Sequence, residues 1–492
     1  MECWNELINT ALLGTGKKTP VPEHLPPVLK ETADRIAEQA EDNEARFLQT
    51  AALVFNLRQS GTRALPSTTE LPAPAEEEEL SYCNEEAIPV LKDILGQEAA
   101  GLLRLWLENC VGRSLIVRPD LVPILFRTSA QDRSIKALVD RCCGKRGEWL
   151  SRFERKWQMA ATEISPEVWK TGTLPERKEQ LLLLRETDPA QALEWLKETW
   201  PQDDAATRAE LLGLLEEHLS GIDLAFLEGL ASDKSKKIKE LALTLLKRIP
   251  GSPIVQQYGE ILRVALQVKK DKGFLGLKSK TGLEIHLPEI PASVFQSGIE
   301  KLSSDKNVPD DAFIVYQLMQ STPPEQYTEW WALPPGEVIS LFEKDPFFQK
   351  LIPAMAEAAV SFKSAAWAEA FMQANIFYAG LLPLLSPEAQ EKYGNTFFAD
   401  QPEPILQWAL RRKGEWGLDL ARHIFRYTAK NAYQYNRAFY TRYIHLVPGR
   451  IALELEKYTP PEPHLQNMWS GNSEHILQLL HLKARIFQTL NA

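Results

Sequence analysis

The 492-residue sequence has few of the residues that build disulfide frameworks and metal sites. Its five cysteines are an odd number with one adjacent pair, which suits neither a disulfide framework nor a zinc knuckle. Its eight histidines are scattered, and the closest two, His475 and His481, are spaced so that they do not share one helical face. We therefore expect a reducing, cytoplasmic environment and no bound metal. The cysteines are Cys3, Cys83, Cys110, Cys142 and Cys143.

Catalytic and nucleotide-binding motifs are also lacking. The sequence contains no HExxH, paired CxxC or GxSxG pattern. Residues 14–18 (GTGKK) resemble part of a phosphate-binding loop, but that loop needs a glycine where Ala11 stands and a serine or threonine where Lys18 stands. We therefore expect no cofactor and predict that the chain is not an enzyme. An active site assembled from distant residues is the alternative.

No stretch is long and apolar enough to predict a membrane span. The most apolar run, residues 370–385, is shorter than a bilayer crossing and is interrupted by Gln373 and Asn375, so it predicts a buried helix. Residues 1–13 lack the basic region of a signal peptide and carry Glu2 and Glu6 among their apolar residues. We expect no membrane partner.

Helical patterns occupy nearly all of the chain, and strand signals are rare. An internal repeat with a period of 31 residues runs through the middle of the sequence, and each period has room for two helices. Such a pair cannot bury its apolar face alone, so the pairs are expected to stack. The predicted fold class is all-α, a HEAT-like α-solenoid of helix pairs with a small extended or hairpin insertion near residues 269–291. The matching residues are Leu183-Leu184, Leu214-Leu215 and Leu245-Leu246, with Arg177, Arg208 and Lys239.

Composition and pattern divide the chain into five predicted segments. The segment 59–86 is rich in Pro, Ser, Thr and Glu, a composition that cannot bury enough apolar surface to order itself, and it is interpreted as a linker. The segments are an N-terminal helical segment (1–58), the linker (59–86), HEAT-like repeats (87–268), an extended insertion (269–292) and a C-terminal helical region (293–492).

Charge is unevenly distributed along the chain. The formal net charge is -10, which argues against a surface built as a whole for nucleic acid or anionic lipid. Residues 233–280 and 411–450 are nevertheless strongly basic. A short sequence motif occurs twice, as KRGEW at 145–149 and as RKGEW at 412–416, and we call it the echo. The second copy lies in the second basic block. Each copy predicts a turn whose glycine ends one helix and whose tryptophan anchors the next.

The two basic blocks supply candidate interaction residues. In the first, two lysines start a predicted helix, where their charge opposes the helix dipole. In the second, three cations step by four along one helical face, with tyrosines and phenylalanines interleaved. This composition is typical of single-stranded nucleic-acid platforms and of protein interfaces, and a solvated basic face over an aromatic core gives the same pattern. The candidates are Lys236, Lys237, Arg422, Arg426, Lys430 and Arg437. The interleaved aromatic residues are Tyr427, Tyr433, Tyr435, Phe439, Tyr440 and Tyr443.

Several segments resemble a bacterial family of unknown function. They are WNELINTALLGT at 4–15, RGEWL at 146–150, LRETDP at 184–189, DKS at 233–235 and RIPGS at 248–252. The resemblance covers most of the first 290 residues. It implies HEAT-type helical repeats and genes that lie beside those of a MoxR-type AAA+ ATPase, a von Willebrand factor A domain protein and a SWIM zinc-finger protein. The resemblance carries no catalytic residues with it.

These observations favour a non-catalytic scaffold or adaptor that binds a protein partner. The resemblance implies the AAA+ ATPase or the von Willebrand factor A domain protein as that partner. The alternatives are a nucleic-acid-binding repeat protein that uses the basic blocks, and an enzyme with an unrecognised site.

Overall fold

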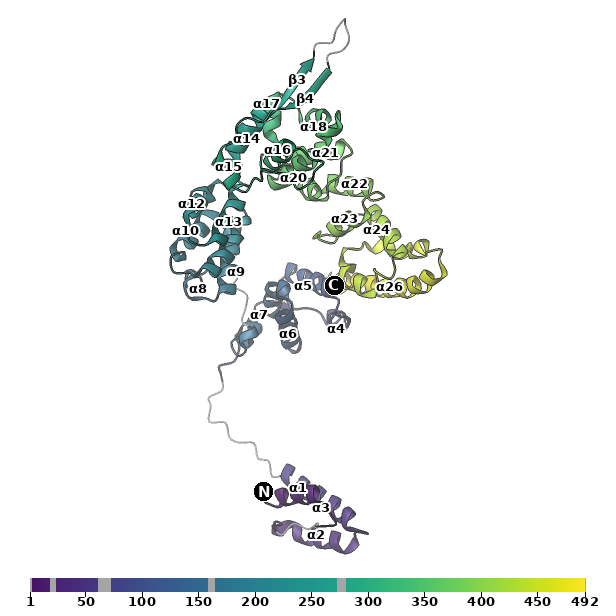
Figure 1. The fold of residues 1–492 in the computed structure, drawn as a ribbon. Coiled ribbons are helices and arrows are strands. Elements are labelled where there is room, and N and C mark those ends of the chain that lie inside the picture. Colours follow the sequence, from purple (N-terminus) through teal and green to yellow (C-terminus); the bar gives the residue numbers. More distant parts are fainter. Residues whose placement is uncertain (1, 18–23, 61–71, 158–163, 272–279, 492) are drawn as a thin grey trace. The chain divides into compact units, whose positions relative to one another are not determined.

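The computed structural model describes residues 2–17, 24–60, 72–157, 164–271 and 280–491. Within these ranges the chain is almost entirely helical, with two small two-stranded sheets (Figure 1). The chain forms two compact units, Met1–Pro74 and Ala75–Ala492, so the division lies inside the segment interpreted as a linker. The predicted all-α fold class is confirmed.

The first unit has a small core between three helices. Trp4 meets Phe55 across two of them, with ring centroids 6.1 Å apart. Only a few apolar side chains are buried here, and others stay in solvent: Leu12 is 79% exposed and Val28 is 74% exposed. The helices are α1 (Glu2–Leu13), α2 (Pro27–Gln39) and α3 (Asn43–Ser60).

Four helices open the second unit, and the last of them is broken at Gly144. The φ of this glycine is 60°, in the left-handed region that glycine tolerates without a Cβ clash. Where the helix restarts, the backbone N–H groups of Lys145 and Arg146 donate to the Glu78 carboxylate at 2.8 and 2.9 Å. The helices are α4 (Ala87–Gly96), α5 (Ala100–Gly112), α6 (Val122–Gln131) and α7 (Lys136–Ser151).

The acidic end of the linker segment lies along this helix. The Lys145 Nζ is 3.5 Å from a Glu76 carboxylate oxygen and 3.8 Å from one of Glu79. Strand β1 (Ser81–Tyr82) then pairs in parallel with β2 (Leu115–Ile116). The first copy of the echo is therefore helical, and the turn predicted there is wrong: Gly144 makes the break, whereas Gly147 packs against Cys143 inside the helix.

The middle of the chain contains the predicted helix pairs. Helices α9, α11 and α13 begin at Leu174, Ala205 and Lys236, in steps of the 31-residue period. A buried leucine recurs at the same position of the period and joins one core: Leu184 in α9, Leu215 in the 3-10 helix Leu214–Glu216 that follows α11, and Leu246 in α13. The elements here are α8 (Pro166–Thr171), α9 (Leu174–Thr187), α10 (Pro189–Thr199), α11 (Ala205–Gly213), α12 (Leu224–Gly229), α13 (Lys236–Leu246) and α14 (Pro253–Ala265).

Charged and aromatic residues repeat at the same period. In the first two of the three copies an arginine pairs with an aspartate near the start of the next pair and lies over a tryptophan ring, whereas the third copy has Lys239 at this position. The ion pair is 2.6 Å long in the first copy and 3.0 Å in the second, and the guanidinium is 4.6 and 5.4 Å from the ring centre. The two sets are Trp169, Arg177 and Asp203, and Trp200, Arg208 and Asp233.

The insertion predicted near residues 269–291 is an antiparallel hairpin. Strand β3 (Leu266–Asp271) pairs with β4 (Lys280–Ile285), with Leu266 opposite Ile285. Leu266 and Leu283 are buried in the large core, so the base of the hairpin is anchored in the helical array. The tip, residues 272–279, lies outside the described residues.

Helices return after the hairpin. The apolar run 370–385, predicted as one buried helix, is divided: α21 ends at Gln373, Asn375 has a φ of 59°, and a 3-10 helix follows at Ala379–Leu384. The helices are α15 (Ala292–Gln296), α16 (Asp310–Gln320), α17 (Glu325–Trp331), α18 (Pro335–Glu343), α19 (Pro346–Gln349), α20 (Ile352–Ser361), α21 (Ala365–Gln373), α22 (Pro387–Phe397), α23 (Pro402–Ala409), α24 (Leu418–Lys430), α25 (Arg437–Tyr443) and α26 (Pro463–Asn491).

The last helix of the second unit packs on its first helices. Figure 1 shows the end of α26 beside α5, and contacts join α26 to both α4 and α5. Arg485 pairs with Asp93 at 3.1 Å, and the Asn84 side chain donates to the Thr489 carbonyl. Helices α4–α7 therefore share one core with residues 258–490, while the repeats α9–α13 have a core of their own.

Candidate functional site

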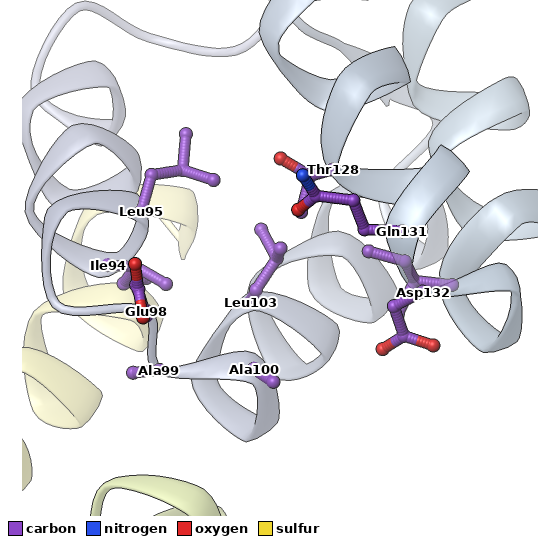
Figure 2. A pocket seen from close by; sticks show the side chains of 10 residues that line it. Ile94, Leu95, Glu98, Ala99, Ala100, Leu103, Thr128, Gln131 and Asp132 are labelled. Atoms are coloured by element: carbon purple, nitrogen blue, oxygen red, sulfur yellow. The ribbon is translucent and has the colours of Figure 1, made fainter. Parts of the chain in front are cut away.

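Helix α5 lies between two hollows. The first has a volume of about 350 Å³ and lies between the α4–α5 corner and the end of α6. Figure 2 shows Leu95 and Leu103 on one side of this hollow and Thr128 and Gln131 on the other. The carboxylates of Glu98 and Asp132 also line this hollow, so its lining is partly apolar and partly acidic.

The second hollow, of about 530 Å³, lies on another face of α5. Its lining combines Arg104 and Glu108 of α5 with the 411–415 loop, His445 and Phe487. It is therefore built where the two ends of the second unit meet.

A third hollow, of about 750 Å³, adjoins it. It lies between the 379–383 segment and α23, and it shares Arg412 and Lys413 with the second hollow. We call these two hollows together the loop groove, because the 411–415 loop separates and lines both.

The loop is held in place from both sides. Arg412 pairs with Glu391, and its guanidinium lies 5.2 Å from the centre of the Trp408 ring. Glu415 pairs with Lys483 of α26 at 2.7 Å. Trp416 is buried and its Nε1 donates to the Ala409 carbonyl at 3.0 Å, so this copy of the echo is a turn with an anchoring tryptophan, as predicted. The glycine does not end the preceding helix, because α23 already ends at Ala409.

Two buried bases lie under the loop groove. Lys483 is only 4% exposed and donates to the carbonyls of His445 and Val447 at 2.8 and 2.7 Å. Burial lowers the pKa of Lys483, and the Glu415 carboxylate opposes that shift. Burial and the charge of Lys483 also lower the pKa of His445 to about 4.

The His445 ring lies directly against the backbone of α5. A Cβ at Gly101 would be 2.0 Å from the His445 Nδ1, so only glycine permits this approach. This Nδ1 is buried without a hydrogen-bond partner among the described residues. The histidine is therefore a neutral part of the junction near neutral pH.

The exposed part of the loop is basic. Arg411 and Lys413 are exposed, and neither forms an ion pair within the described ranges of the chain. The backbone N–H groups of residues 413–415 also lack a hydrogen-bond partner among those ranges. Free amides and unneutralised cations side by side suit a carboxylate or a phosphate.

The predicted residues of α24 and α25 lie elsewhere. Arg422 is half-buried and bonds Glu454 at 2.6 and 3.0 Å and Asp419 at 2.9 Å, so its charge is neutralised locally. Arg426 and Lys430 are exposed on the same helix. Arg437 is exposed, and its Nε donates to the Gly471 carbonyl at 3.1 Å.

The aromatic residues interleaved with them mostly face the protein interior. Tyr435 and Tyr440 are 4% and 2% exposed, and Tyr427 bonds the Glu403 carboxylate at 3.1 Å. Tyr433, at 64% exposure, is the exception and stacks on His464. The structure therefore presents basic side chains there over an aromatic core.

Lys236 and Lys237 lie on a different part of the fold. Both are exposed in the first turn of α13, and Lys236 pairs with Glu240 at 3.6 Å. The structure does not bring them together with the cations of α24 and α25 in one hollow.

The loop-groove residues were not among the predicted site residues. Arg411 and Lys413 were counted in the basic block, and Gly414 and Glu415 in the echo, but no sequence signal placed α5 opposite them. The repeated RKGEW motif was the one local sequence feature that singled out this loop.

Metal-binding clusters and membrane-spanning helices are absent from the described part of the chain. No group of three or more His, Cys, Asp or Glu side chains is placed there to hold a metal ion. None of the described helices combines the length and the apolar character needed to cross a bilayer.

The fold and the loop groove define a helical-repeat protein with a basic loop where the two ends of its second unit meet. Residues 6–490 match the family described as "Family of unknown function (DUF5691)", and the chain belongs to this family. The match extends the resemblance from the first 290 residues to nearly the whole chain. Searches among curated proteins and among solved structures gave no match.

Proposed function

We propose that this chain is a non-catalytic scaffold or adaptor of the bacterial cytoplasm that binds a protein partner. The loop groove carries the proposal, because two hollows meet there at a loop with two exposed cations, Arg411 and Lys413, that have no ion pair among the described residues. Its pKa-shifted groups, His445 and Lys483, are tied into the packing of the junction. The family resemblance suggests a MoxR-type AAA+ ATPase or a von Willebrand factor A domain protein as the partner.

An affinity pull-down from the native cytosol tests this function. The tagged full chain is isolated after nuclease treatment, and the recovered proteins are identified by mass spectrometry. Recovery of the AAA+ ATPase or the von Willebrand factor A domain protein, followed by binding of that purified partner, is the expected result.

The same experiment tests the nucleic-acid alternative. Exposed Lys236, Lys237, Arg426 and Lys430 favour that alternative, whereas the buried aromatic residues disfavour a stacking platform. Recovery of nucleic acid that disappears on nuclease treatment, with no protein partner, contradicts the scaffold function.

A further inference from the structure

We propose that the loop groove binds an extended acidic segment of a protein partner. This proposal rests on the proposed function and names the chemistry of the partner. Charge complementarity is its first support: Arg411 and Lys413 are exposed on the loop without ion pairs among the described residues. Arg104 of α5 also lines the second hollow, where its charge is shared with Glu108.

The backbone of the loop is the second support. The N–H groups of residues 413–415 have no acceptor within the described chain. Both ends of this stretch are tied to the fold by side chains, because Arg412 pairs with Glu391 and Glu415 pairs with Lys483. A carboxylate that binds at the loop has these N–H groups as donors and the Lys413 ammonium as a cation, and charge-assisted hydrogen bonds of this kind are strong.

The third support is a contact that the chain makes with itself. At the first copy of the echo, the N–H groups of Lys145 and Arg146 hold the Glu78 carboxylate, and the Lys145 ammonium lies near Glu76 and Glu79. An acidic extended segment is thus already bound by a KRGEW sequence. The RKGEW copy has the same residue types beside the loop groove, but as a turn and not as a helix start. The Arg412 N–H, which corresponds to that of Lys145, donates to the Ala409 carbonyl, so Lys413 and the N–H groups of residues 413–415 are what remains for a carboxylate.

A protein segment fits the groove better than single-stranded nucleic acid. Bases need exposed aromatic faces to stack on. Two aromatic residues line the groove: Trp408 is 7% exposed and covered by the Arg412 guanidinium, and Phe487 is half-buried. Neither ring is fully open for a base to stack on. Cations and amides remain for contact, and they recognise carboxylates without any stacking.

Fluorescence polarisation of the full chain with a labelled peptide tests the proposal. The probe copies residues 73–82 of this chain, APAEEEELSY, whose glutamates already bind the first echo copy. We expect saturable binding that weakens with salt. We also expect the double variant R411E/K413E to lose about tenfold or more in affinity, since two attractive charges become repulsive.

Matched controls separate this site from others. The double variant K236E/K237E makes the same charge change on α13 and is expected to bind like the parent chain. A probe with glutamine at all four glutamate positions is expected not to bind. Circular dichroism of each variant confirms that the helical content is retained.

Three outcomes overturn the proposal. One is no saturable binding up to about 1 mM probe, the weak end of specific recognition. Another is binding that K145E abolishes and R411E/K413E does not, because the probe would then only replace the chain's own acidic segment. The third is displacement by a dT12 oligonucleotide that binds more tightly through the same two residues.

The pull-down distinguishes the groove from the scaffold function. If R411E/K413E recovers the same protein partner as the parent chain, the scaffold function stands and the groove is not its binding site. If no partner is recovered but the peptide still binds, the groove stands and the assigned partner class fails.

Discussion

At the scale of single residues, His445 makes stability depend on pH. Its pKa of about 4 lies below the ordinary 6.5, because burial and Lys483 disfavour the charged ring. Between pH 6.5 and pH 4 this histidine binds a proton in the unfolded chain but stays neutral in the folded chain. The free energy of unfolding therefore falls as the pH falls. We expect a loss of about 2 kcal/mol in unfolding free energy from pH 7 to pH 5 through this residue, measured by urea denaturation.

Substitution isolates the contribution of this ring. His445→Gln removes the titration, so the variant is expected to lose about 2 kcal/mol less than the parent chain over the same pH interval. His464→Gln, at an exposed histidine, is the control and leaves the pH dependence unchanged. Equal pH dependence in the parent chain and His445→Gln would show that the ring is not held neutral by the fold.

At the scale of elements, the restart of α7 depends on Glu78. Its carboxylate accepts from two backbone N–H groups at the N-terminus of the second half of α7. Glu78→Ala removes this cap and is expected to lower the unfolding free energy by about 1 kcal/mol. It also releases the acidic segment, so limited proteolysis between residues 72 and 86 becomes faster.

The neighbouring glutamate provides the comparison. Glu77 is exposed, and Glu77→Ala makes the same change in charge one residue away. We expect Glu77→Ala to leave both stability and proteolysis close to those of the parent chain. The same effect from both variants would mean that the charge of the segment matters and that the cap does not.

At the scale of the whole second unit, the two separate cores predict that a destabilising substitution in one core leaves the other core folded. Ile486 of α26 is fully buried in the core that also contains α4 and α5. Ile486→Asp places a charge there and is expected to loosen α4 and α5 while the repeats α9–α13 keep their own core. Hydrogen exchange by mass spectrometry reads both regions in one experiment.

Leu477 lies on the same helix and is 44% exposed. Leu477→Asp is the control, and it is expected to leave hydrogen exchange in both regions unchanged. Faster exchange in α9–α13 equal to that in α4 and α5 after Ile486→Asp would show that the two cores unfold as one.

The sequence predicted the features that depend on neighbouring residues, namely the helices and the period of the repeats. The period of the repeats was visible because Leu184, Leu215 and Leu246 are buried by the same packing in each pair. The orientation of the tyrosines was not predictable, since an aromatic core under a basic face and an aromatic platform give the same spacing. The loop groove could not be predicted from the sequence, because it depends on α5 lying opposite the 411–415 loop. No local pattern encodes contacts between residues so far apart in the chain.

The packing of α26 on α4 and α5 has a consequence for synthesis. The bond between Asn84 and Thr489 joins residues 405 apart, and the core around α5 is complete only when both are present. A ribosome adds about 5–20 residues per second, so roughly 20 to 80 seconds pass between the synthesis of α4 and α5 and that of α26, which covers them. During that time their apolar faces are open to chaperones, whereas the repeats α9–α13 already have every helix of their core.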